Sequence, residues 1–181
     1  MSGGADHNGS DRNGTLNEMV VESVRVHMMS SQHVVILRDT VRERYLPIWI
    51  GPWEANAIAM RLQGVTPERP MTHDLFWQTL SELGVVVKQI VVSDLADDTF
   101  RARLLLQMDG REVDLDARPS DAIALAVRCG VPIFATDAVL DRAGVIFESA
   151  EEEKLSVFRE FVNSLNVDLP EDPEEQQRRL D

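Results

Sequence analysis

The dipeptide Asp109-Gly110 constrains the fold of this chain more than any other feature of the sequence. Both central positions of a two-residue hairpin turn take positive φ, which aspartate and glycine tolerate. Folding about this turn places Leu106 opposite Val113 on an apolar face, because side chains alternate along a strand. The same register places Arg103 opposite Asp116 on a polar face, where arginines meet a row of carboxylates. The segment therefore predicts two antiparallel strands in one defined register.

A helix is predicted directly after the second hairpin strand. Pro119 suits the first helical turn, where its missing N–H is not needed, and Gly130 suits a left-handed helix end. Between them, apolar residues recur at helical spacing. The densest polar group of the chain surrounds this junction and consists of Asp114, Asp116, Arg118, Ser120 and Asp121. Carboxylates and an arginine at a helix start are groups that bind cations and phosphates.

The remaining pattern predicts an α+β fold, an antiparallel-rich sheet with helices packed against it in a single domain. Strands are expected at 18–29, 33–37, 45–50, 85–93 and 131–135, and the first three form a meander. Val20, Val24 and Val26 share one parity and predict the half-buried face of the first strand. Helices are expected after Gly51-Pro52, from a Thr72 cap to Gly84, and at 137–143. The predicted boundaries are a disordered arm at 1–16, the domain at 17–147, an amphipathic helix at 148–167 and an acidic flexible tail at 168–181.

Composition narrows the possible partners. The net charge is −13, and residues 148–181 supply most of the acidic excess. No basic stripe is visible, which counts against tight metal-free binding of nucleic acid. Cys129 is the single cysteine, so neither an internal disulfide nor a thiolate zinc cluster is expected. The sequence shows no signal peptide or membrane-spanning run, which predicts a soluble cytoplasmic protein without a membrane partner.

Several segments together resemble one known family. They are Leu46–Gly51, Glu54–Ala59, Arg69–Leu75, Asp116–Leu125 and the Val131-Pro-Ile sequence of the last predicted strand. This order and spacing resemble the bifunctional nuclease domain family from about Glu18 to about Gly144. The resemblance implies an α+β domain that forms homo-oligomers. It also implies a metal-stimulated phosphodiesterase that cleaves DNA and RNA.

Hydrolysis of a phosphodiester requires an activated water and positive charge beside the phosphate, which Mg²⁺ or Mn²⁺ held by carboxylates supplies. The candidate metal ligands are Asp114, Asp116, Asp121 and Glu54. Asp116, Asp121 and Glu54 are also the candidates for activating water, and Arg118 is the candidate phosphate clamp. Ser120 and His73 are candidate substrate-binding residues. The resemblance thus implies a divalent-metal-dependent nuclease.

Each of these residues also has a purely structural interpretation. Asp116 would pair with Arg103 across the hairpin, and Asp121 and Glu54 would complement helix dipoles. Thr72 as a helix cap explains the His73-Asp74 pair without chemistry. The three tryptophans would pack in the core or between subunits rather than stack on bases. These interpretations favour a rival function, a non-catalytic oligomeric binding or regulatory module.

Overall fold

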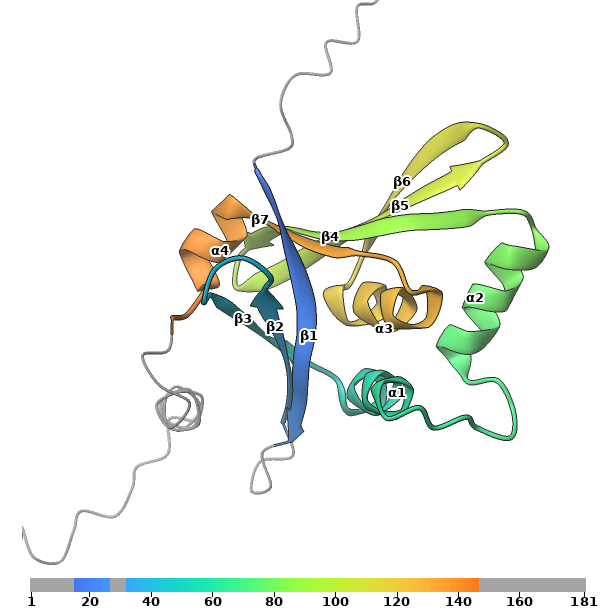
Figure 1. The fold of residues 1–181 in the computed structure, drawn as a ribbon, viewed down its shortest axis with the longest axis horizontal. Helices are drawn as coiled ribbons and strands as arrows, with labels where there is room; N and C mark the ends of the chain where they lie inside the picture. Colours follow the sequence, from blue (N-terminus) through green and yellow to red (C-terminus); the bar gives the residue numbers. More distant parts are fainter. Residues whose placement is uncertain (1–14, 27–31, 147–181) are drawn as a thin grey trace, which may run out of the picture. The chain divides into compact units, whose positions relative to one another are not determined.

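The structure is a computed structural model that describes residues 15–26 and 32–146 (Figure 1). The predicted helix at 148–167 and the predicted acidic tail at 168–181 lie outside the described residues, as does the predicted arm up to residue 14. Leu16 already belongs to the first strand, so the predicted end of the arm at residue 16 was wrong. Within the described ranges, no helix is long and apolar enough to cross a membrane.

The described part of the chain contains seven strands and four helices. They are β1 Leu16–Val26, β2 His33–Asp39, β3 Tyr45–Ile50, α1 Pro52–Leu62, α2 Thr72–Glu82, β4 Val86–Ala96, β5 Thr99–Met108, β6 Arg111–Ala117, α3 Pro119–Cys129, β7 Ile133–Thr136 and α4 Asp137–Ala143. The strands form one sheet in the order β3-β2-β1-β7-β4-β5-β6. Neighbours run antiparallel except β4 and β7, which are parallel. This topology confirms the predicted α+β fold with an antiparallel-rich sheet.

The hairpin formed by β5 and β6 has the register that the sequence predicts. Leu106 pairs with Val113, and Arg103 pairs with Asp116. The turn residues Asp109 and Gly110 have φ of 51° and 75°, the left-handed conformation that this turn requires. The predicted meander of β1, β2 and β3 is confirmed as well.

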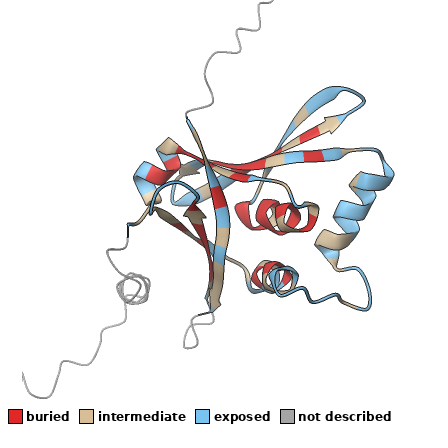
Figure 2. Cartoon of the chain, viewed as in Figure 1, coloured by how far each residue is buried: buried red, intermediate tan, exposed pale blue. Residues whose placement is uncertain are grey.

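Helices α1 and α3 lie against one face of the sheet, and α3 is the buried centre of this layer (Figures 1 and 2). The buried residues of α3 include Ala122, Ile123, Leu125 and Ala126. The small alanine side chains let the backbone of α3 approach its neighbours closely. Because α3 contacts α1, α2, β4 and β5, its N-terminus is held in place relative to the other two helices.

Two β-bulges change what the strand patterns predicted. A bulge between Val21 and Ser23 switches the inward face of β1, so Met19 is buried while Val20 and Val26 are exposed. The predicted single half-buried face was therefore wrong. A second bulge, between Val92 and Asp94, lets β4 continue to Ala96 instead of ending at Ser93. A bulge inserts one residue and breaks the alternation on which such patterns depend.

Helix α2 lies at the margin of the fold and has no buried residue (Figure 2). The predicted Thr72 cap was wrong, because Met71 is the N-cap residue and Thr72 begins the helix. Asp74 supplies the capping interaction instead, since its Oδ2 accepts a hydrogen bond of 2.9 Å from the backbone N–H of Met71.

The predicted burial of the tryptophans in the core was also wrong. Trp49 is 46% exposed, Trp53 is 82% exposed and Trp77 is 37% exposed. Single exposed aromatic side chains are common on protein surfaces and do not by themselves identify a partner. Packing between subunits therefore stays a prediction for these residues, as does stacking on a ligand.

Candidate functional site

Helices α1, α2 and α3 begin near one another, and a pocket of about 510 Å³ lies among their N-termini. We call it the three-helix pocket; it is lined by Trp53, Glu54, Ala57, Pro70, Met71, Thr72, His73, Arg118 and Asp121. The first backbone N–H groups of a helix have no partner within the helix and carry partial positive charge. A place where helices begin therefore favours an anion such as phosphate.

Glu54 enters the pocket from the first turn of α1. Gly51 is extended (φ −68°, ψ 156°) and Pro52 is the first helical residue, so the helix starts abruptly after β3. A Cβ atom on Gly51 would collide with Oε2 of Glu54. Oε1 of Glu54 accepts a hydrogen bond of 2.7 Å from Nη2 of Arg118. The glycine thus leaves the space in which the Glu54 carboxylate turns toward Arg118.

Arg118 and Asp121 come from the junction between β6 and α3. Arg118 is the extended N-cap residue of α3, and Asp121 lies in its first turn. Nε of Arg118 donates a hydrogen bond of 2.7 Å to Oδ2 of Asp121. The Arg118 guanidinium therefore bridges two carboxylates from two helices, while its side chain stays 66% exposed.

His73 joins the same cluster from the first turn of α2. Its Nε2 lies 3.0 Å from Oδ1 of Asp121, and its side chain is largely buried. An ionised carboxylate only accepts hydrogen bonds, so this contact places the proton of a neutral imidazole on Nε2. Nδ1 is then the ring nitrogen that can accept a proton, which is the chemistry of a general base.

The ionisation states follow from these contacts. Partial burial alone would raise the pKa of Asp121, but hydrogen bonds from Arg118 and His73 outweigh it and lower the pKa below its usual value. Hydrogen bonds to Asp121 and then to Glu54 raise the pKa of Arg118. Asp121 is therefore ionised and Arg118 is charged at neutral pH.

An ion pair joins α2 to α3 through the buried Arg128 and the partly buried Asp74. Nε of Arg128 donates a hydrogen bond of 2.6 Å to Oδ1 of Asp74, and its Nη1 and Nη2 donate to the backbone oxygens of Ala124 and Ala57. Burial would raise the pKa of Asp74, but the bonds from Arg128 and from the Met71 N–H lower it. Because Asp74 follows His73 directly, this pair positions His73 beside Asp121.

The structure brings together four of the residues that the sequence singled out: Glu54, His73, Arg118 and Asp121. Asp114 and Asp116 lie on β6 and line neither pocket that contains Arg118. The suggested pairing of Asp116 with Arg103 is replaced by a diagonal ion pair, in which Asp114 bonds to Arg103 at 2.6 Å. Asp74 and Arg128 were missed as a pair, although an arginine in the otherwise apolar stretch 122–129 was a visible signal.

The binding of Mg²⁺ or Mn²⁺ by the predicted ligands stays a prediction. Among residues 15–26 and 32–146, no three or more histidine, cysteine, aspartate or glutamate side chains gather in a way that could hold a metal ion. Glu54 and Asp121 both bond to Arg118, so the positive charge between them is the guanidinium. A cation bound to both carboxylates would have to displace Arg118.

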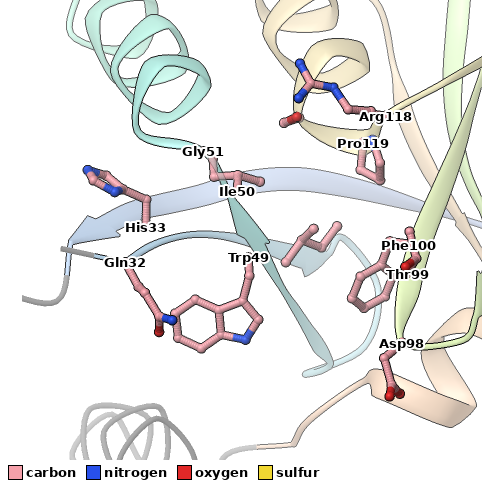
Figure 3. A pocket seen from close by; sticks show the side chains of 12 residues that line it. Gln32, His33, Trp49, Ile50, Gly51, Asp98, Thr99, Phe100, Arg118 and Pro119 are labelled. Atoms are coloured by element: carbon pink, nitrogen blue, oxygen red, sulfur yellow. The ribbon is translucent and has the colours of Figure 1, made fainter. Parts of the chain in front are cut away.

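A second hollow of about 450 Å³ adjoins the three-helix pocket and shares Arg118 with it. We call it the aromatic hollow, because Trp49 from β3 and Phe100 from β5 line it (Figure 3). Pro119 and the buried Ser120 form part of its wall at the start of α3. Residues from near both ends of the sheet meet here, which shows that the sheet bends around α3.

Comparisons with known proteins show the family of this chain. The model of the bifunctional nuclease domain matches residues 35–148, and this chain belongs to that family. The Mycobacterium tuberculosis (strain ATCC 25618 / H37Rv) protein named "Uncharacterized protein Rv1829" is 42% identical over 162 residues, which are 84% of this chain and 97% of that protein.

Two plant relatives carry the name of the activity. "Bifunctional nuclease 1" of Oryza sativa subsp. indica is 23% identical over 153 residues, 82% of this chain and 46% of that protein. "Bifunctional nuclease 2" of Oryza sativa subsp. japonica is 29% identical over 106 residues, 56% of this chain and 33% of that protein. The chain therefore spans less than half of each plant relative.

Proposed function

We propose that this protein cleaves phosphodiester bonds in DNA and RNA, and that the three-helix pocket holds the phosphate that reacts. The observation that carries the proposal is the position of Arg118. Its exposed guanidinium lies where three helices begin, beside the His73–Asp121 pair. Membership of the bifunctional nuclease domain family supports the same chemistry.

Binding of the phosphate uses Arg118 and the helix N-termini. An arginine presents several N–H donors in a fixed plane, which match the oxygens of a phosphate. Nε of Arg118 donates a hydrogen bond to Asp121, and Nη2 donates one to Glu54. The two carboxylates hold the guanidinium in one orientation. Glu54 is therefore a positioning residue that acts through Arg118.

The reaction uses the His73–Asp121 pair. A water molecule attacks phosphorus and gives a proton to Nδ1 of His73, and the bond from phosphorus to the leaving oxygen breaks. The leaving oxygen takes its proton from solvent. Asp121 holds the imidazole by its Nε2 and stabilises the positive charge that forms on it. The requirement for Mg²⁺ or Mn²⁺ stays a prediction, and no step above depends on it.

A cleavage assay with two matched variants tests the site. Labelled single-stranded DNA and RNA are incubated with purified protein in Mg²⁺, in Mn²⁺ and in chelator. Glu54→Gln is expected to lower the cleavage rate by about 10- to 100-fold, because a neutral amide no longer holds the guanidinium in place. Asp116→Asn, on β6, is expected to cleave like the parent. Loss of activity in Asp116→Asn with full activity in Glu54→Gln would move the site to the β5–β6 hairpin.

The exposed apolar surface of α2 favours a second role, that of an assembly module. Leu75 and Phe76 of α2 and its C-cap residue Leu83 are large apolar side chains, and all three are exposed. We propose that this surface joins copies of the chain into a homo-oligomer, since such a surface is normally covered in solution. Self-association and catalysis are compatible, and the cleavage assay separates them.

Measuring the molar mass by light scattering tests the assembly. The parent is expected to be larger than a monomer, and Leu75→Glu is expected to dissociate it, because a charge would have to be buried in the contact. Val41→Glu is the control, since Val41 is 88% exposed between β2 and β3 and far from α2 in the chain. A monomeric parent, or a Leu75→Glu variant of unchanged mass, would contradict the proposed contact.

A further inference from the structure

The aromatic hollow is not used by the chemistry proposed above. Among the described residues, Arg118 is the one lining residue that it shares with the three-helix pocket, and much of its lining is apolar surface from Trp49, Ile50, Phe100 and Pro119. Gln32 and Thr99 add polar groups at its wall (Figure 3). A flat aromatic ligand with a polar edge has the chemistry that matches this lining.

Trp49 is a large aromatic residue of the hollow that lies outside the core. It lies on β3, an edge strand of the sheet, between Ile48, which is buried in the core, and Ile50. Alternation along the strand turns Trp49 away from the core, and almost half of its side chain faces solvent. The indole therefore contributes little to the core while offering a flat surface to the hollow.

The shared residue connects this surface to the phosphate site. Arg118 lines both the aromatic hollow and the three-helix pocket. In a nucleotide, the base and the phosphate are joined through one sugar, so a phosphate held at Arg118 brings its own base or the next one to an adjoining surface. An unpaired base has both of its faces available for stacking, whereas a base in a duplex does not.

Electrostatics supports a stacking contribution. The chain carries a net charge of −13, so long-range attraction to a polyanion does not provide its affinity. Stacking of a base on an aromatic side chain requires no net positive charge on the protein and tolerates every base, because every base has a π-face. It equally tolerates deoxyribose and ribose, as a substrate range of DNA and RNA requires.

We propose that the aromatic hollow binds one unpaired nucleobase of a single-stranded nucleic acid, stacked on Trp49, while Arg118 holds a neighbouring phosphate. This inference rests on the proposed function and defines its substrate as single-stranded. Phe100 closes the side of the hollow that faces β5.

Fluorescence anisotropy measures the contribution of the base. The probes are a short labelled oligothymidylate and an abasic oligonucleotide of equal length, both with phosphorothioate linkages that slow cleavage. The parent is expected to bind the oligothymidylate about tenfold more tightly than the abasic strand. Trp49→Ala is expected to lose this difference without changing its affinity for the abasic strand.

Three further variants, Trp49→Phe, Trp77→Ala and Trp53→Ala, keep the test decisive. Trp49→Phe retains a ring and is expected to retain most of the difference, which separates stacking from a folding defect. Trp77→Ala, on α2 and outside the hollow, is expected to bind like the parent. If Trp49→Ala still prefers the base-bearing strand, or if Trp53→Ala alone abolishes the preference, the proposed subsite is wrong. Base-dependent binding by a parent that never cleaves would instead refute the nuclease function and leave the subsite confirmed.

Discussion

Replacing Arg118 with alanine is expected to lower the rate of cleavage of single-stranded DNA and RNA by about 10³-fold. An arginine that contacts the reacting phosphate stabilises the charge that develops on its oxygens, and its loss has effects of this order. The folded state should survive, because Arg118 is an exposed residue whose ion pairs contribute little to stability. Initial rates on labelled strands, with circular dichroism as the check on folding, measure the effect.

Two comparisons sharpen this prediction. Arg118→Lys keeps the charge but cannot bond to Glu54 and Asp121 in a plane while also meeting a phosphate, so it should bind the strand and cleave it slowly. Arg111→Ala removes an exposed arginine of β6 that lines neither pocket, and it should leave the rate unchanged. Equal activity of Arg118→Ala and the parent would remove Arg118 from the mechanism.

Replacing Asp74 with alanine is expected to lower the free energy of unfolding by about 3–5 kcal/mol. The change would leave the Arg128 guanidinium buried without its carboxylate partner, and breaking a buried pair from one side has costs of this size. Asp114→Ala is the matched control, because it breaks the exposed pair with Arg103 and should change stability by less than about 1 kcal/mol. Urea unfolding of both variants and the parent measures the difference. Equal losses of stability in the two variants would show that the Asp74–Arg128 pair contributes no more than an exposed ion pair.

Acid should remove the contribution of the ionised Asp74 to the stability of the parent protein. Arg128 and the Met71 N–H lower the pKa of Asp74 in the folded state, so its stabilising effect is complete above the unfolded pKa of about 4. The effect is then lost as the pH falls through the lower folded-state pKa. Asp74→Asn, which cannot titrate, should therefore show a flatter decline of stability below pH ~4 than the parent. A decline as steep as the parent's would assign acid unfolding to other carboxylates.

The sequence predicted correctly those elements whose structure depends on residues that are adjacent in the chain. The β5–β6 hairpin and the start of α3 follow from turn and proline chemistry at Asp109-Gly110 and Pro119, and the structure confirms both. The bulges in β1 and β4 and the exposed face of α2 depend on what each element packs against, and no local pattern contains that information. Because the bulge in β1 depends on such packing, the local pattern did not predict that Met19 is buried and Val20 is exposed.

The candidate site was predictable in its residues and not in its arrangement. Glu54, His73, Arg118 and Asp121 each stand at a helix start, which the sequence shows. Their meeting depends on α3 packing between α1 and α2, and on the long-range pair of Asp74 with Arg128. Asp114 and Asp116 have the same chemistry as Asp121 but lie on the strand before the helix, and they do not line the three-helix pocket, so residue type alone does not show which carboxylates meet there.

The most direct test of the account observes the arginine that is proposed to hold the phosphate. Nitrogen-15 NMR of the arginine Nε–H groups, with the Arg118 signal assigned by its loss in Arg118→Lys, is recorded during titration with a phosphorothioate single strand. The account predicts a saturable shift of the Arg118 signal that a strand with neutral methylphosphonate linkages does not produce. An Arg118 signal that stays unchanged while the protein binds and cleaves the natural strand would contradict it.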